Sequence, residues 1–295
     1  MANRRNPPTV RLRRLATELL RLRKAARLSR EAVTERTGIN NVTLYRLETG
    51  RSRPQRRTLF ALLDLYQVGG RNRSELLELS LGAEYPGWLR QYQDELPEVY
   101  TAFIAFEAEA RTACNYESLF IPGLLQTGGY ARAVIGGVLA WANEQEVEQR
   151  VQARLVRQAV LASEDPLRLW AIVDEAAIRR VVGGPGVMSE QAYHLLDMVK
   201  LSNVTLQIIP FDRGAHPGMP GSFIQLGFPD PADPDLVYVD SMGGDLFLEG
   251  DAHVRRYTIA FEHLRALALS PAESAKIIFE AAADLAGYSD VHESE

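Results

Sequence analysis

Four residues divide the stretch from residue 29 to residue 50 into two short helices. Ser29 and Asn40 belong to the residue types that cap helix starts, and Gly38 and Gly50 belong to the type that ends helices in the left-handed conformation. The helix after Ser29 must end near Gly38, and the next one begins only two residues later at Asn40. This spacing predicts a helix, a tight turn and a second short helix.

Apolar residues at intervals of three and four predict further helices on both sides of this unit. Leucines repeat in this way from residue 10 to residue 26, and the pattern returns at residues 55–66 and 74–81. Residues 1–80 are therefore predicted to form an all-helical bundle that contains a helix-turn-helix.

The rest of the chain predicts a mixed α/β domain with many helices, so the expected fold class is α+β and multidomain. Residues 81–115 are rich in aromatic side chains and predict a helical connector, and residues 116–295 predict a regulatory or partner-binding domain. Strands at 167–173 and 204–210, joined by a helical crossover, predict a parallel pair. Further strands are expected at 223–228, 236–240 and 246–248, where turns rich in proline and aspartate separate them and predict antiparallel pairing.

The second helix of the helix-turn-helix is expected to bury one side and expose the other. Leu44 and Leu47 lie three residues apart and point inward, so their neighbours point outward, where side chains can read bases or hold phosphates. We expect Arg46 to bind guanine, Asn41 adenine and Val42 a thymine methyl. Phosphate or sugar contacts are expected from the other candidate residues, which are Arg30, Thr43, Tyr45, Arg51 and Arg53.

Charge is distributed very unevenly along the chain. Residues 1–75 contain 18 basic and 6 acidic residues, a net charge of +12, whereas residues 76–295 contain 15 basic and 32 acidic residues, a net charge of −17. A strongly basic segment is the electrostatic signature of a polyanion binder. Double-stranded DNA is therefore the expected partner of the first domain, and the acidic remainder is expected to have another task.

Residues 28–54, LSREAVTERTGINNVTLYRLETGRSRP, resemble the lambda-repressor-like, XRE-type helix-turn-helix regulators. That family pairs a glycine turn with a later glutamate, glycine and proline, which match Gly38, Glu48, Gly50 and Pro54. The sequence departs from the family at Thr34, where a small alanine is usual, and at Asn40 and Asn41.

Three later stretches are similar to the C-terminal domain of antitoxin-like XRE regulators of actinobacteria. They are residues 116–135, residues 203–223 and the stretch LVYVDSMGGDLFLE that begins at Leu236. The resemblance covers about residues 10–286 and implies a transcriptional regulator that is often paired with a small toxin-like protein. It implies no catalytic residue.

A glycine-rich loop at residues 214–218 marks a candidate ligand or partner pocket. The loop follows the second strand of the parallel pair, and open α/β sheets bind ligands beyond the carboxyl ends of their strands. The candidate lining residues are His216, Ser222, Tyr238 and Asp240. The alternative is a turn in which His216 caps a strand end. Residues 120–130 are similarly open to two interpretations, as a peptide-binding edge or as protein interior.

Several classes of function lack their sequence signatures. The chain has no glycine-rich nucleotide loop, no serine elbow and no zinc-binding helix, so we expect no enzyme, no cofactor and no metal. Cys114 is the single cysteine and cannot form an intrachain disulfide. Residues 118–143 are interrupted by Pro122, glycines and Arg132, which argues against a membrane span. Residues 1–20 do not resemble a secretion signal, and we expect a cytoplasmic protein.

Together these features predict a sequence-specific DNA-binding transcriptional regulator with a C-terminal sensing, dimerisation or partner-binding domain. We expect a homodimer, because such modules place two reading helices about 34 Å apart on duplex DNA. The alternative is an antitoxin that neutralises a small toxin-like partner and regulates its own operon. An unknown small-molecule effector is compatible with both hypotheses.

Overall fold

The structure is a computed structural model that describes residues 10–81, 87–92, 96–230, 233–241, 244–248 and 250–292. It divides the chain into two units. The first comprises Met1–Gln93 and Pro97–Glu109, and the second comprises Asp94–Leu96 and Ala110–Glu295. Each unit has its own hydrophobic core, and each is described by itself.

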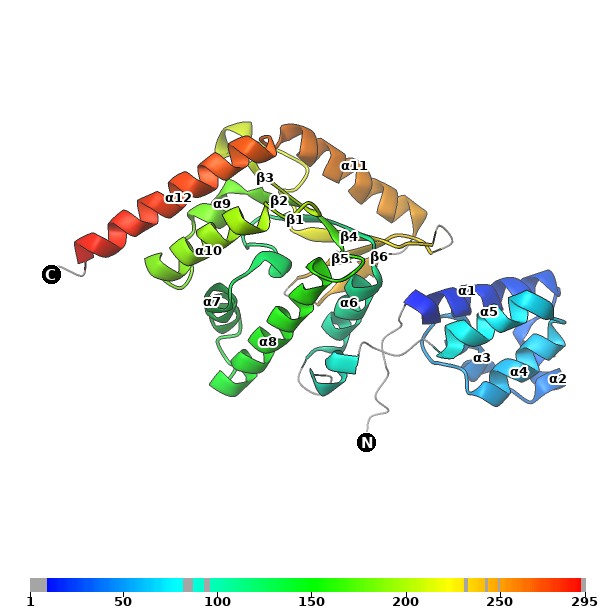
Figure 1. The fold of residues 1–295 in the computed structure, drawn as a ribbon. Helices are drawn as coiled ribbons and strands as arrows, with labels where there is room; N and C mark the ends of the chain where they lie inside the picture. The colour runs from blue at the N-terminus through cyan, green and yellow to red at the C-terminus, as the bar shows by residue number, and fades with distance from the viewer. Residues whose placement is uncertain are drawn as a thin grey trace. The chain divides into compact units, whose positions relative to one another are not determined.

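The first unit is entirely helical in its described part (Figure 1). Leu15 and Leu19 of the first helix, Leu44 and Leu47 of the third and Leu62 of the fourth are buried in one core. This arrangement confirms the helical bundle expected from the leucine spacing. Its helices are α1 (Val10–Ala25), α2 (Arg30–Thr37), α3 (Asn41–Glu48), α4 (Arg56–Leu65), α5 (Gly70–Leu81), η1 (Gly87–Tyr92) and α6 (Glu98–Glu109).

The capping residues act as their chemistry predicts. Ser29 Oγ accepts the backbone N–H of Ala32 at 3.1 Å, and Asn40 Oδ1 accepts that of Val42 at 2.8 Å. Gly38 adopts a φ of 72°, a conformation that a residue with a side chain rarely takes. Ser29 therefore fixes the start of α2, and Gly38 and Asn40 fix the turn between α2 and α3.

The second unit is built on a six-stranded mixed sheet with the strand order β3-β2-β1-β4-β5-β6. The first three strands of the chain pair in parallel, and the last three add antiparallel strands on the other side of β1. The pairing confirms the mixed sheet expected from the sequence. The strands are β1 (Thr112–Glu117), β2 (Arg168–Asp174), β3 (Val204–Ile209), β4 (Phe223–Gly227), β5 (Leu236–Val239) and β6 (Leu246–Leu248).

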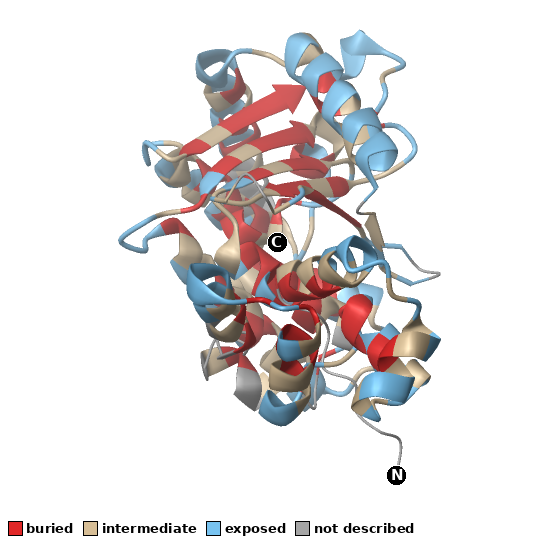
Figure 2. Ribbon diagram, turned by 90° about the vertical axis from the view of Figure 1, so that its right-hand side faces the viewer, coloured by how far each residue is buried: buried red, intermediate tan, exposed pale blue. Residues whose placement is uncertain are grey.

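Helices cover both faces of this sheet, and Figure 2 shows most of its strands buried. On one face, Phe261 and Leu264 of α11 pack with Tyr116 and Phe223. On the other side, α10 packs against α12, which also contacts β3. The elements are η2 (Gly123–Leu125), α7 (Gly128–Val138), α8 (Glu144–Arg157), η3 (Gln158–Leu161), α9 (Glu175–Arg179), α10 (Pro185–Met198), η4 (Phe211–Arg213), α11 (Asp251–Leu267) and α12 (Pro271–His292).

The structure differs from the sequence-based expectation at the end of the connector. Residues 81–115 were expected to be helical, but α6 ends at Glu109 and Thr112 begins the central strand β1. This strand pairs on one side with β2 and on the other with β4, both far along the chain. Pairing on both edges outweighs the weak strand propensity of the segment TACNYE.

None of the described helices has the length and apolar character that crossing a membrane requires. The longest of them, α12, begins with the expected capping arrangement, in which Glu273 accepts the Ser270 backbone N–H at 2.9 Å.

Candidate nucleic-acid interface

Helix α3 has one buried side and one exposed side. Leu44 and Leu47 are buried in the core of the first unit, whereas 56% of Val42 and 37% of Tyr45 remain exposed. The helix therefore presents a row of side chains to an external partner. The predicted DNA-contacting residues of α3 are Val42, Thr43, Tyr45 and Arg46, which are exposed, and Asn41, which is partly buried.

A buried carboxylate fixes α3 against the two helices that precede it. Glu48 Oε2 accepts a hydrogen bond from Arg23 Nη2 of α1 at 2.9 Å and another from Arg30 Nε of α2 at 2.9 Å. Arg23 Nε also donates to Glu48 Oε1, and the Glu48 hydrogen bonds raise the pKa of Arg23 above its ordinary value. In the sequence, Glu48 stands out only through a family resemblance. Its position four residues after the inward Leu44, on the same side of the helix, is the signal that could have indicated a buried role.

Two of the predicted phosphate-binding arginines lie against the ring of Tyr45. The guanidinium carbon of Arg30 is 5.0 Å from the ring centroid, and that of Arg51 is 5.5 Å from it. Both distances are within the range of cation–π attraction. The structure therefore brings together one residue from α2, one from α3 and one from the loop after α3.

Asn41 makes a side-chain contact within the first unit, in addition to the adenine contact expected from the sequence. Its Nδ2 donates to Glu31 Oε1 of α2 at 2.9 Å. Hydrogen bonds from the backbone of Glu31 itself, from Ser29 and from Asn41 lower the pKa of Glu31, so its carboxylate stays ionised. A base that binds the side-chain amide of Asn41 must therefore compete with the Glu31 carboxylate for it.

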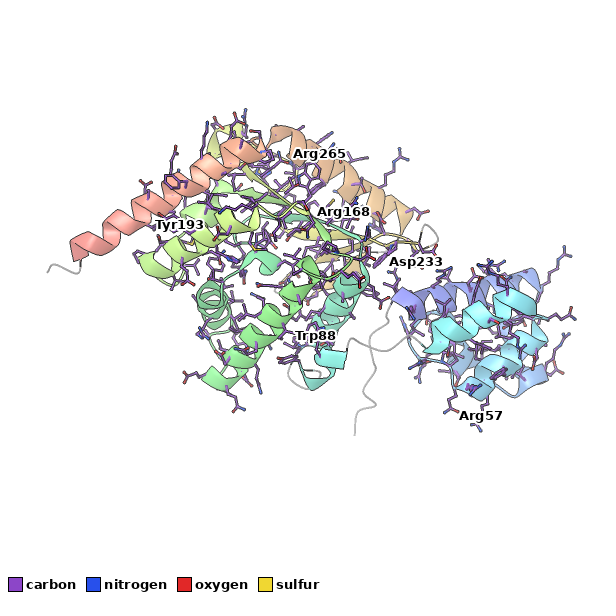
Figure 3. All side chains as sticks on the ribbon, in the orientation of Figure 1. Arg57, Trp88, Arg168, Tyr193, Asp233 and Arg265 are labelled. Atoms are coloured by element: carbon purple, nitrogen blue, oxygen red, sulfur yellow. The ribbon has the colours of Figure 1, made fainter. Side chains whose placement is uncertain are left out.

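Arg53 also has a partner inside the first unit. Its Nε donates to the Ser80 carbonyl of α5 at 2.8 Å, and its Nη2 donates to the same oxygen. The side chain thus connects the loop after α3 to the last turn of α5. Arg57, labelled in Figure 3, is exposed at the start of α4 and points away from the unit.

In the second unit, three of the four candidate pocket residues lie at the edge of the sheet where β1 and β5 end and β4 begins. They are Ser222, Tyr238 and Asp240. Successive side chains of a strand point to opposite faces. Because Tyr116 and Val237 pack under α11, Glu117 and Tyr238 point to the other face. Ser222 Oγ accepts the Ser118 backbone N–H there at 3.1 Å, directly beside Glu117.

The charged groups at this edge influence one another. The pKa of Glu117 is raised to about 7, mainly by burial and also by Asp240, whereas hydrogen bonds from Ser222 and Asn115 and the charge of Arg154 of α8 act in the opposite direction. Burial, a hydrogen bond shared with Asp245 and the negative charge of Asp245 raise the pKa of Asp240 as well, because protonated Asp240 can donate to the Asp245 carboxylate. Tyr238 donates its hydroxyl to Asp245 Oδ2 at 2.8 Å. We call the group formed by Glu117, Arg154, Ser222, Tyr238, Asp240 and Asp245 the sheet-edge cluster.

His216, the fourth candidate, lies elsewhere. Its buried side chain places Nε2 3.4 Å from Asp174 Oδ2 at the end of β2, and its Nδ1 accepts the Gly218 backbone N–H at 3.2 Å. Its ring is 5.9 Å from that of Tyr116, which faces α11. The imidazole thus fixes its own loop to the end of a strand, which favours the structural interpretation of the turn.

Most of the segment after β1 is protein interior, although Leu119 and Phe120 at its start are 46% and 38% exposed. Leu125 and Tyr130 are buried, and three glutamine side chains hold the backbone near them. Gln191 Nε2 donates to the Leu125 carbonyl at 2.7 Å, and Gln158 Nε2 donates to the Gln126 carbonyl at 2.7 Å. Gln126 in turn donates from its own side-chain nitrogen to the Ile121 carbonyl at 2.6 Å.

The described residues include no group of three or more His, Cys, Asp or Glu side chains that could hold a metal ion. The sheet-edge cluster is a mixed polar site, in which carboxylates lie near the guanidinium group of Arg154 and the hydroxyl groups of Ser222 and Tyr238. Such a site can bind by hydrogen bonds and charge, and its two raised carboxyl pKa values make it sensitive to protons.

Comparison with protein-family models gives two matches that follow the two units. Residues 14–76 match a helix-turn-helix domain, and residues 100–280 match a domain of unknown function, DUF5753. Neither the curated proteins nor the solved structures contain a match to the chain. The first match supports a DNA-binding regulator of the helix-turn-helix class. Because the second spans more than half of the chain, the protein belongs to the DUF5753 family, with a helix-turn-helix domain preceding the family domain.

Proposed function

We propose that the chain is a sequence-specific transcriptional regulator of the XRE type and that α3 reads the major groove. The observation that carries the proposal is the exposed side of α3, where Val42 and Arg46 face outward while Leu44 and Leu47 are buried. Arginines around α3 supply positive charge for the phosphates, which position a protein on DNA without reading its sequence. Residues 1–75, with a net charge of +12, provide the long-range attraction.

Arg46→Ala and Arg51→Ala are expected to change DNA binding in different ways. Loss of a guanine contact by Arg46→Ala should relax the preference at one base pair by about 1 to 3 kcal/mol. Loss of a phosphate contact by Arg51→Ala should weaken binding to all sequences alike and reduce the dependence of log affinity on log salt by about one unit. Selection from random duplexes, followed by salt titrations of the selected ones, measures both effects. Equal weakening of all sequences by Arg46→Ala would remove Arg46 from the reading residues.

We further propose that the chain binds its operator as a homodimer. Helix-turn-helix dimers contact half-sites about 34 Å apart, so the operator should be an approximate palindrome. Sedimentation of the protein bound to a selected duplex measures the stoichiometry. A single chain on an asymmetric half-site would contradict the proposal.

For the second unit we propose a sensing role at the sheet-edge cluster, without catalysis. The chain leaves β1 for β2 on one side and later returns to β4 on the other side. In open α/β sheets, ligands bind at the carboxyl edge where the strand order reverses in this way. The raised pKa of Glu117 supports the proposal, because perturbed carboxyl groups are concentrated at functional sites.

A second candidate function is that of an antitoxin which binds a small protein through the second unit. The observation that favours it is the end of α7 and the turn that follows, where 53% of Val138 and 80% of Trp141 are exposed. Large exposed apolar side chains that lie close together mark protein interaction sites. Co-expression with the product of a short neighbouring reading frame tests it, with Trp141→Ser as the variant that should lose the complex.

A further inference from the structure

The ring of Tyr45 lies within reach of two guanidinium groups on the exposed side of the first unit. Arg30 approaches it from α2 at 5.0 Å, and Arg51 approaches it from the loop after α3 at 5.5 Å. All distances are from the guanidinium carbon to the ring centroid. A tyrosine ring attracts cations through the negative potential of its face.

Both arginines are also held at a second point. Arg30 donates its Nε to the buried Glu48 carboxylate at 2.9 Å, so its remaining donors are the two terminal amino groups. The backbone N–H of Arg51 donates to the Arg46 carbonyl at 2.8 Å, which fixes the start of the loop to α3. The Tyr45 ring thus restricts side chains whose other ends are already fixed.

Among the described residues, no hydrogen bond of the Tyr45 hydroxyl takes part in this arrangement, which depends on the ring alone. A free arginine side chain loses much rotamer freedom when it binds a phosphate. Restricting that side chain before binding removes part of this cost and raises affinity.

We propose that Tyr45 is a positioning residue, whose ring holds Arg30 and Arg51 ready to bind the phosphodiester groups of the DNA backbone. The inference rests on the proposed DNA-binding function and departs from the expectation that Tyr45 itself contacts a phosphate or sugar. It assigns the effect of Tyr45 to two other side chains, which a double-mutant cycle can test.

The experiment measures the affinity of the full chain for two probes at 50 mM salt, where phosphate contacts are strong. The probes are 20-base-pair duplexes, one set with random sequence and one set selected by the wild-type chain. Tyr45→Phe is expected to bind both within about twofold of wild type, because it keeps the ring. Tyr45→Ala is expected to bind both about tenfold more weakly, because it leaves two arginines unrestricted.

The decisive measurement repeats Tyr45→Ala where its arginine partners are missing. In an Arg51→Gln background, which keeps the contact between Arg30 and Glu48, the added loss should fall to about threefold. In an Arg30→Gln, Arg51→Gln background it should fall below about twofold. Val42→Ala is the matched control on the same helix side, and its effect should be equal in all backgrounds.

Two results would overturn the inference. A tenfold loss that persists in both backgrounds would show that Tyr45 contacts the duplex directly, and a Tyr45→Phe variant as weak as Tyr45→Ala would assign the effect to the hydroxyl. Thermal unfolding of each variant checks that the first unit stays folded. Failure of the wild-type chain to bind any duplex would instead overturn the proposed function, so the two failures are distinguishable.

Discussion

Replacing Glu48 with alanine is expected to lower the free energy of unfolding of the first unit by about 3 to 5 kcal/mol. The substitution removes the carboxylate that pairs with Arg23 of α1 and Arg30 of α2. Only 11% of the Arg23 side chain is exposed, so its charge would remain largely buried without its partner. Removing one member of a buried ion pair is costly for this reason. Urea-dependent hydrogen exchange of the α1 and α3 amides in the full chain measures the change unit by unit.

A matched control is available on α1. Glu18 forms an ion pair with Arg21, but 59% of that arginine side chain is exposed. Glu18→Ala should therefore cost less than about 1 kcal/mol. An Arg23→Met, Glu48→Met double variant should recover part of the stability lost in Glu48→Ala, because apolar side chains can replace a buried pair at little cost. A cost for Glu48→Ala no larger than that of Glu18→Ala would show that the buried pair does not support the bundle.

The stability of the second unit is expected to fall as the pH rises from about 5 to 8. Burial raises the pKa of Glu117 from its ordinary 4.5 to about 7. Between these two values the folded state keeps a proton that the unfolded state has released, so unfolding releases a proton and higher pH favours it. The raised pKa of Asp240 acts in the same direction.

Glu117→Gln should remove most of this decline, since a glutamine cannot lose a proton in this range. The expected gain over wild type at pH 8 is about 3 kcal/mol, from about 1.4 kcal/mol per pKa unit. Calorimetric unfolding at pH 5 and pH 8 measures it. Glu148→Gln is the control, because Glu148 is a carboxylate of the same unit whose pKa is lowered by Gln152 and Arg132. Parallel declines in wild type and Glu117→Gln would contradict the assignment of the proton to Glu117.

Local chemistry explains which parts of the fold could be predicted. Ser29, Gly38 and Asn40 act on residues within four positions of themselves, so their effect is visible in the sequence. Strand β1 is different, because its pairing partners begin at Arg168 and Phe223. A strand stabilised by such distant segments has no strong local pattern, which is why its first residues were expected in a helical connector.

The same distinction applies to the site. The exposed side of α3 follows from the helical repeat that buries Leu44 and Leu47. The contact of Arg53 with Ser80 joins residues 27 positions apart, and the sheet-edge cluster joins Glu117 to residues more than 100 positions later. His216 was grouped with Ser222 because both follow β3, but sequence order alone does not assign a loop residue to one face of a sheet.

The glutamine contacts after β1 have a consequence for how the second unit responds to acid. Primary amides do not ionise, so the hydrogen bonds from Gln126, Gln158 and Gln191 are the same at every pH in the physiological range. This backbone support therefore stays constant while Glu117 gains or loses its proton. Any rearrangement driven by acidity should therefore begin at the ionisable groups of the sheet-edge cluster, which meets this support where Arg154 Nη1 donates to Gln126 Oε1 at 2.9 Å.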